Sequence, residues 1–195
     1  MEPLIPGLCY PIYNNAHGNK NLFREPENYR YFLQQYQKHL SPVADTLAWC
    51  LMPNHFHLLI KIKVAKGLEN HKNLEGLNEE LLPSFISKQI SNLFSSYSMA
   101  VNIRYNRKGS LFIKNFKRKQ ISSNEYFGQL IAYIHLNAIK HGFATLAEDW
   151  VWTYYHEYLS NKFSFINKYP ALEWFGSIRL FKPFHEEYVK ELRAR

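Results

Sequence analysis

The sequence lacks the features that would place the protein in a membrane or outside the cell. Residues 1–13 contain no basic segment followed by an apolar run, so we expect no signal peptide. No apolar stretch approaches the length of a transmembrane helix. The two cysteines, Cys9 and Cys50, do not have the spacing of a zinc or redox motif, which favours free buried thiols. We therefore expect a cytoplasmic protein with no membrane partner.

Acidic residues are also scarce. The chain of 195 residues has 24 lysines and arginines against 16 aspartates and glutamates, which gives a net charge of +8. Such a surplus indicates an anionic partner, either a nucleic acid or an acidic membrane surface. With 46% hydrophobic residues, the chain can bury an ordinary core. Its length is enough for one domain with some extension.

Hydrophobic periodicity and turn residues predict an α+β fold. We expect strands at residues 9–16, 43–52, 55–62 and 114–121, and helices at residues 25–40, 83–105 and 122–142. The polar stretch 66–82 is expected to be a mobile connection with a marginal helix. The order β-α-β-β-α-β-α is that of a ferredoxin-like (split βαβ, RRM-like) antiparallel sheet with helices on one face, plus one added helix at 122–142 and an aromatic-rich C-terminal extension. The other face would be free for a ligand.

Two histidines stand two residues apart in an otherwise apolar predicted strand, within AWCLMPNHFHLLIKI. His55 and His57 project from one face while Phe56 points into the core, because side chains alternate along a strand. Two imidazoles on one face can hold a divalent metal ion. Such a pair is more often two structural histidines with ordinary partners. This apolar strand offers them few core partners, which favours the metal site.

A second polar group lies in the segment LIAYIHLNAIKHGF. At helical spacing, one face of it carries Tyr133, Asn137, Lys140 and His141. A solvated polar face is the ordinary alternative. A tyrosine beside a metal ion can instead act as a nucleophile, because its hydroxyl is a weak nucleophile unless a metal or a base activates it. Its attack on a phosphodiester yields a phosphotyrosine ester and a free hydroxyl.

These residues resemble the motifs of the single-tyrosine HUH transposases, especially the REP-associated tyrosine transposases and their insertion-sequence relatives. LMPNHFHLLI is similar to the family's histidine–hydrophobic–histidine motif, and YIHLN to the segment of its catalytic tyrosine. The resemblance continues in YNRKGSLFIKNFKRKQI and AEDWVWTYYHEY and covers about residues 8–160. The family commonly has proline where Ala138 stands and often arginine where Lys140 stands. Neither difference removes a ligand or a nucleophile.

The resemblance implies a DNA transposase, which is a site-specific single-stranded DNA endonuclease and strand transferase. It assigns the nucleophile to Tyr133, through a 5′-phosphotyrosine intermediate, and the metal ligands to His55, His57 and Asn137. The metal would be Mg²⁺, which prefers oxygen ligands, or Mn²⁺, which accepts imidazole more readily. The expected substrate is single-stranded DNA with an adjacent hairpin, bound by a monomer or a homodimer. Residues 1–160 would form the catalytic domain and 161–195 a helical extension packed on it.

The positive charge is concentrated between the two motifs. From Leu81 to Asn124 there is no aspartate or glutamate. A solvated basic face is the ordinary interpretation of such a run, but its place between the motifs favours a surface that follows DNA phosphates. Because side chains alternate along a strand, we expect Arg118 on the face opposite that of Lys117 and Lys119. The candidate phosphate contacts are Arg104, Arg107, Lys108, Lys117, Lys119 and, beside the tyrosine, Lys140.

Two other function classes stay open on the sequence alone. One is a ferredoxin-like nucleic-acid-binding module without catalysis, for which Tyr133 would not matter. The other is a metal-dependent phosphoesterase that uses water as the nucleophile. The lack of carboxylate ligands near His55 and His57 in the sequence argues against this class. A metal-dependent covalent adduct between the protein and an oligonucleotide would distinguish all three classes.

Overall fold

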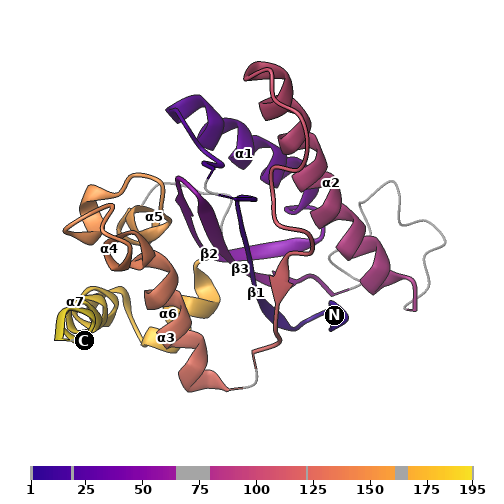
Figure 1. The fold of residues 1–195 in the computed structure, drawn as a ribbon. Coiled ribbons are helices and arrows are strands. Elements are labelled where there is room, and N and C mark those ends of the chain that lie inside the picture. The colour runs from indigo at the N-terminus through magenta and orange to yellow at the C-terminus, as the bar shows by residue number, and fades with distance from the viewer. Residues whose placement is uncertain (1, 19, 65–79, 122, 161–166, 195) are drawn as a thin grey trace.

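The strands form one four-stranded antiparallel sheet (Figure 1). The structure is a computed structural model that describes residues 2–18, 20–64, 80–121, 123–160 and 167–194. The order in the sheet is β2-β3-β1-β4, and each neighbouring pair runs antiparallel. The strands are β1 (Cys9–Asn15), β2 (Ala44–Met52), β3 (His55–Ile62) and β4 (Lys117–Arg118). The predicted α+β class and antiparallel sheet are confirmed.

Two helices cover one face of the sheet (Figure 1). They are α1 (Pro26–His39) and α2 (Leu82–Arg104), which pack against each other. Phe56 of β3 contacts Phe32 of α1 and Phe94 of α2, with ring centroids 5.2 and 5.6 Å apart. The ferredoxin-like assignment stays an interpretation of this element order. The predicted connection 66–82 lies almost entirely outside the described residues.

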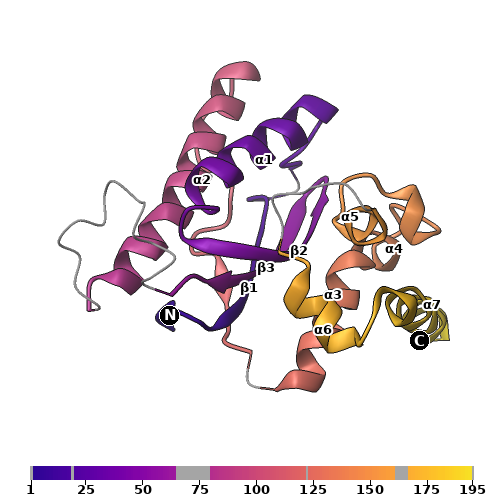
Figure 2. The same cartoon turned by 180° about the vertical axis from the view of Figure 1, so that it is seen from behind.

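The second face of the sheet is not free, contrary to the expectation. Helix α3 (Asn124–His135) packs across β2 and β3 and buries Leu130, Ile131 and Ile134. Burying each such side chain contributes about 1.5–3 kcal/mol, so the helix covers the sheet rather than standing clear of it. On the same side lie α4 (Asn137–Lys140), the 3₁₀ turn η2 (Ala147–Asp149), α5 (Tyr155–Leu159), α6 (Tyr169–Phe175) and α7 (Ile178–Ala194) (Figure 2). Within the described residues, no helix is long and apolar enough to span a membrane.

The helix that carries the tyrosine is broken, whereas the sequence predicted a continuous one. Leu136, with φ −96° and ψ 7°, separates α3 from α4. Side-chain donors lie near carbonyl groups at the break. The Thr153 hydroxyl is 3.4 Å from the carbonyl oxygen of His135, and the Asn137 side-chain amide is 3.5 Å from that of Tyr133. These donors satisfy carbonyl groups that a continuous helix would have bonded internally.

Strand β4 is shorter than predicted. Only Lys117 and Arg118 form a ladder with β1, although a strand was expected over residues 114–121. Asn115 has a left-handed backbone with φ +65°, which interrupts the extended conformation just before the ladder. The alternation predicted for this segment is nevertheless present, because Arg118 turns towards α2 and donates to the Ser87 hydroxyl at 3.0 Å.

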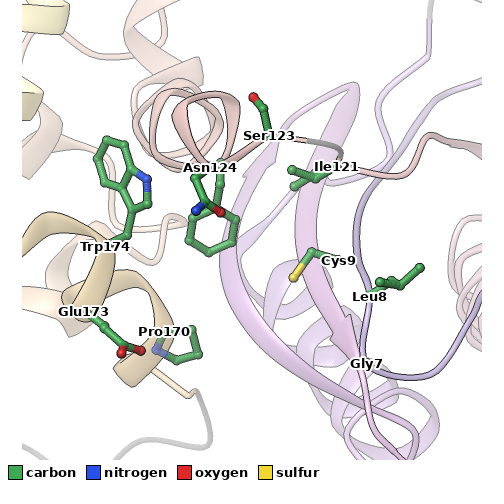
Figure 3. Close-up of a pocket in the computed structure, with 10 residues that line it drawn as sticks. Gly7, Leu8, Cys9, Ile121, Ser123, Asn124, Pro170, Glu173 and Trp174 are labelled. Carbon is green, nitrogen blue, oxygen red and sulfur yellow. The ribbon is translucent and has the colours of Figure 1, made fainter.

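Close contacts hold the C-terminal helices against α3. A Cβ built on Gly128 of α3 would stand 2.1 Å from the Trp174 ring of α6, so the indole lies directly on the helix backbone. His135 of α3 and His185 of α7 are both buried, and their ring nitrogens are 3.0 Å apart. Trp174 and the start of α3 border a cavity of about 510 Å³. Figure 3 shows the residues that line it. The domain boundary placed after residue 160 adjoins residues outside the described ones and stays a prediction.

Gly128→Ala should destabilise the protein by about 1–3 kcal/mol, because the added methyl group forces the tryptophan ring to move. The double variant Gly128→Ala/Trp174→Ala should lose less than the sum of the two single losses, since the ring that the methyl group meets is gone. Urea unfolding of the four proteins measures the difference. Strictly additive losses would show that this contact does not constrain the position of α3.

Candidate active site

His55 and His57 project from β3 towards α3 and α4, on the face opposite Phe56. Their ring centroids are 5.5 Å apart. His55 is buried with 7% of its surface exposed, and His57 is half-buried. Asn137 of α4, itself fully buried, reaches the same place. The two segments singled out in the sequence therefore meet on one face of the sheet.

His55 has a partner at each ring nitrogen. Its Nδ1 lies 2.7 Å from Oδ1 of Asn54 in the turn between β2 and β3, and its Nε2 lies 3.4 Å from Oδ1 of Asn137. Both partner atoms are amide oxygens, so either ring nitrogen of His55 can carry the proton and donate to its partner. The amide nitrogen of Asn137 is turned to the Tyr133 carbonyl, which leaves the Asn137 oxygen facing His55 Nε2. In the tautomer with the proton on Nδ1, the Nε2 lone pair and the Asn137 oxygen can both face a cation.

This donor set fits a divalent ion of the Mg²⁺ or Mn²⁺ class. Neighbouring ligands of such an ion are about 3 Å apart, which is close to the 3.4 Å between His55 Nε2 and Asn137 Oδ1. No group of three histidine, cysteine, aspartate or glutamate side chains in the described part of the chain could hold a metal. An ion bound by two imidazoles and one amide oxygen would therefore keep positions open for substrate oxygens.

Both histidines are neutral at physiological pH. Burial, with a smaller contribution from the nearby His141, lowers the pKa of His55 to about 4. Burial also lowers the pKa of His57 to about 3, with smaller contributions from His55, His141 and Lys140. A neutral imidazole keeps the lone pair that a metal ligand needs, so the surroundings of the pair favour metal binding over a proton.

Tyr133 lies directly beside the histidines. Its ring stands edge-on to the ring of His57, with centroids 5.6 Å apart and planes at 86°. The ammonium group of Lys140 is 4.7 Å from the centre of the Tyr133 ring. Tyr133, Asn137 and Lys140 therefore lie together as predicted, although the helix is broken at Leu136. The site therefore brings together a phenol, two imidazoles, an amide oxygen and an ammonium group.

Two comparisons show known proteins to which the chain is similar, although no protein-family model matches it. Its sequence is 23% identical, over 112 residues, to a protein of Haemophilus influenzae with the provisional name REP-associated tyrosine transposase. The match covers 57% of this chain and 59% of that protein, so the chain spans less than two thirds of the relative's length. The chain is related to the REP-associated tyrosine transposases. The family resemblance seen in the motifs is confirmed.

The fold agrees with this relationship. A solved structure of a REP-associated tyrosine transposase bound to a REP hairpin has a TM-score of 0.62 and 14% sequence identity to this chain. The similarity covers 83% of this chain and 84% of the other. It therefore includes most of the sheet and helices, and it shows that the architecture is shared.

One residue at the site, Tyr13 of β1, was not singled out in the sequence. Its ring stacks on His57, with centroids 5.4 Å apart and planes at 19°. His141, which helical spacing placed on the same face as Tyr133, has its ring 4.6 Å from that of His55. Tyr13 pairs with His57 across the β1–β3 ladder. This register is a long-range property, so the only signal in the sequence was the position of Tyr13 in a predicted strand.

Three of the predicted phosphate contacts lie on the same side of the sheet as Tyr133. Lys140 contacts the Tyr133 ring, Lys119 lines the same groove as Tyr133, and the Lys117 ammonium is 5.9 Å from the centre of the Tyr13 ring. All three lysines are exposed. They form a positively charged border on the tyrosine side of the sheet.

The other three predicted contacts lie elsewhere. Arg104 is the last residue of α2, and Arg107 and Lys108 follow it. Helix α2 lies beside α1 on the other face of the sheet from α3 (Figure 1). Arg104 pairs with Glu25 at 2.6 Å, and Arg107 donates to the Asn102 side chain at 2.6 Å. The structure does not bring them to Tyr133, because α2 and α3 cover opposite faces of the sheet.

Proposed function

We propose that the protein is a single-tyrosine transposase, a metal-dependent transesterase that cuts and rejoins single-stranded DNA beside a hairpin. The observation that carries this proposal is the meeting of Tyr133 and Asn137 with the two histidines of β3. His55 and Asn137 are 82 positions apart in the chain, yet their polar atoms are within 3.4 Å. A DNA-binding module without catalysis has no need of a tyrosine and three metal-binding groups at one place.

Tyr133 is the nucleophile of the proposed reaction. Its hydroxyl attacks the phosphorus of the scissile phosphodiester, so that a bond forms between the tyrosine oxygen and the 5′-phosphate. The tyrosine hydroxyl gives up its proton as the bond from phosphorus to the 3′-oxygen breaks, and the 3′-oxygen takes up a proton to become a hydroxyl. Because the ester keeps the energy of the broken bond, a 3′-hydroxyl of another strand can reverse the attack. Strands are thereby joined without ATP.

His55, His57 and Asn137 are the proposed ligands of a divalent ion, Mg²⁺ or Mn²⁺. When bound, the ion polarises the scissile phosphate and stabilises negative charge on its oxygens. Lys140 lies where it can hold a further phosphate oxygen beside the nucleophile. A phosphoesterase that uses water has less support, because no acidic side chain within the described residues completes a metal-binding group with these histidines.

The proposed substrate is DNA with a single-stranded segment next to a hairpin. The REP hairpin bound by the related transposase of known structure supports this proposal, as do the net charge of +8 and the lysines near Tyr133. A positively charged border attracts the phosphate backbone whatever the sequence. An exposed backbone without a partner strand also gives a single tyrosine access to the phosphorus.

A covalent adduct tests the proposed function. The full chain is incubated with labelled hairpin oligonucleotides that carry randomised single-stranded flanks, with Mg²⁺ or Mn²⁺ or with a chelator. We expect a labelled protein band that survives denaturing electrophoresis and that forms only when the metal is present. Peptide mass spectrometry should show that the DNA is attached to Tyr133. Cleavage without any adduct would support water as the nucleophile, and binding without cleavage would support a non-catalytic module.

Lys117→Ala/Lys119→Ala should weaken DNA binding and make it less sensitive to salt. Each phosphate of a single strand that the protein no longer neutralises lowers the slope of log K against log[salt] by about 0.7. The slope of the double variant should thus be smaller by about 1.4, while its maximal cleavage rate changes much less than its affinity. Fluorescence anisotropy at several NaCl concentrations measures the slope.

Arg118→Ala is the matched control for that experiment. Arg118 lies between the two lysines but bonds to Ser87 on the other face of the sheet, so its loss should change the slope less. Equal slopes for the double variant and the wild type would contradict the assignment. The DNA path would then be sought along Arg104, Arg107 and Lys108.

A further inference from the structure

A cavity between α2 and the segment 110–118 lies on the face of the sheet opposite Tyr133. It has a volume of about 590 Å³. It shares no lining residue with the cavity of Figure 3, and none of His55, His57, Tyr133 and Asn137 lines it. Its lining contains serines of α2, three phenylalanines and two cations, and no acidic residue. The cavity therefore has no part in the proposed reaction.

One wall of this cavity is a row of serine hydroxyl groups on α2. Ser87, Ser91 and Ser95 follow one another at spacings of four residues, so they share one face of the helix, and Ser98 continues the row. From Ser87 to Ser98 the helix rises by roughly 16 Å. Ser91 and Ser95 are exposed, and Phe94 beside them is half-buried. The wall thus offers both hydroxyl groups and an aromatic ring to a ligand.

The guanidinium group of Arg118 lies at the Ser87 end of this row and lacks an anionic partner. Its Nη1 donates to the Ser87 hydroxyl at 3.0 Å, and its Cζ is 5.2 Å from the centre of the Phe116 ring. Its Nε is buried and has no hydrogen-bond partner. No ion pair within the described residues includes Arg118. The carboxylate of Glu2, which acts on Arg118 electrostatically, accepts a hydrogen bond from the Gln120 backbone amide instead.

A half-buried charge without a counter-ion is unfavourable. Burial lowers the pKa of Arg118, with opposing effects from Tyr10 and Glu2, so the guanidinium group has lost part of its hydration. It stays protonated, because arginine keeps its charge in proteins. Its Nε–H and one N–H of Nη2 form the fork with which arginine holds two oxygens of a carboxylate or a phosphate. None of the residues that line the cavity supplies a carboxylate for this fork.

A phosphate monoester matches the charges of the cavity better than a DNA backbone does. A monoester carries a charge of about −1.5 to −2 at pH 7, and Lys114 supplies a second cation in the lining beside Arg118. Each phosphodiester of DNA carries only one charge. Lys117 and Lys119, the proposed DNA contacts of β4, leave the strand on the other face of the sheet.

We propose that this cavity is a binding site for a small organic phosphate, separate from the path of the DNA. Ser87 orients Arg118, whose fork holds two phosphate oxygens, and Lys114 neutralises the second charge. An apolar or aromatic body lies along α2 against Phe94. The site needs neither Tyr133 nor a metal ion, so it stands or fails independently of the proposed transesterase.

Isothermal titration calorimetry tests the site with the full chain, in the presence of a chelator and without DNA. The probes are phenyl phosphate, inorganic phosphate and the uncharged benzyl alcohol. We expect one phenyl phosphate to bind per chain, more tightly than inorganic phosphate because its ring contacts Phe94, and benzyl alcohol not to bind. Arg118→Met should weaken phenyl phosphate binding by about 10- to 150-fold, the loss expected for hydrogen bonds to a charged group.

Two further variants separate this site from overall charge. Lys117→Ala/Lys119→Ala removes two positive charges next to Arg118 in the chain but on the other face of the sheet, so its affinity for phenyl phosphate should equal that of the wild type. Ser91→Glu keeps Arg118 and places a carboxylate in the cavity from an exposed position of α2, so binding should be lost. Urea unfolding checks that each variant is folded.

Several results would overturn the site. They are no binding of phenyl phosphate to the wild type, equal affinity in the wild type and Arg118→Met, unchanged binding in Ser91→Glu, and a loss in the lysine double variant as large as that in Arg118→Met. Hairpin oligonucleotides are also titrated with and without saturating phenyl phosphate at constant ionic strength, and we expect the same DNA affinity. Competition would contradict the proposal, because the cavity would then hold a phosphate of the DNA backbone.

Discussion

Tyr133→Phe should abolish both the covalent adduct and the cleavage of single-stranded DNA, with DNA affinity nearly unchanged. Only one oxygen atom is removed, and the ring can keep its edge-on contact with His57 and its contact with the Lys140 ammonium. Because this oxygen is the proposed nucleophile, its loss should lower the rate on the order of 10⁴-fold or more. Denaturing electrophoresis measures the adduct, and anisotropy measures the affinity.

Tyr126→Phe is the matched control for this variant. Tyr126 lies on the same face of α3 and lines the same groove, but it is seven residues from the proposed nucleophile. We expect it to keep the adduct on Tyr133. Cleavage at the wild-type rate by Tyr133→Phe, or an adduct that moves to Tyr126, would show that the nucleophile was wrongly assigned.

The parts of the fold that the sequence predicted well are those with local signals. The apolar run and the Pro53–Asn54 turn predicted a hairpin, and β3 begins at His55 and ends at Ile62 as expected. The break at Leu136 had no local signal, because the hydroxyl that bonds to the preceding carbonyl comes from Thr153, 18 positions away from His135. The shortening of β4 likewise depends on one left-handed residue, Asn115.

The covering of the second sheet face could not be predicted from the order of elements alone. That order is compatible with a free face, and only the packing of α3 across β2 and β3 decides against it. The contact between Gly128 and Trp174 and the pair of His135 and His185 depend on where α6 and α7 return along the chain. Such long-range contacts leave no periodic trace in the sequence.

The centre of the site was predictable because each half has its own pattern. Alternation placed His55 and His57 together, and helical spacing placed Tyr133 near Asn137; the family motifs then joined the two halves. Charge alone was a poorer guide. A run of basic residues does not say which face of a sheet it will reach, and Arg104 lies on the α2 side, paired with Glu25.

His55→Ala and His57→Ala should each remove the Mg²⁺- or Mn²⁺-dependent activity while the protein stays folded. Both imidazoles are held neutral by burial and point to one place, so each supplies a lone pair that alanine cannot replace. Loss of even an outer partner of a metal ligand lowers metal affinity about 10- to 100-fold, and loss of a direct ligand should lower it at least as much. Calorimetric titration with Mn²⁺ measures the affinity directly, and thermal unfolding checks the fold.

Two variants make the metal assignment specific. His141→Ala removes a histidine whose ring is 4.6 Å from that of His55 but which is not an assigned ligand, so Mn²⁺ affinity and activity should remain. Asn137→Asp keeps an oxygen donor and adds a negative charge, so it should bind the ion at least as well as the wild type, whereas Asn137→Ala should bind it less well. Undiminished metal-dependent cleavage in both His55→Ala and His57→Ala would contradict the site. Loss of metal affinity only in His141→Ala would move it to the end of α4, where His141 follows Lys140.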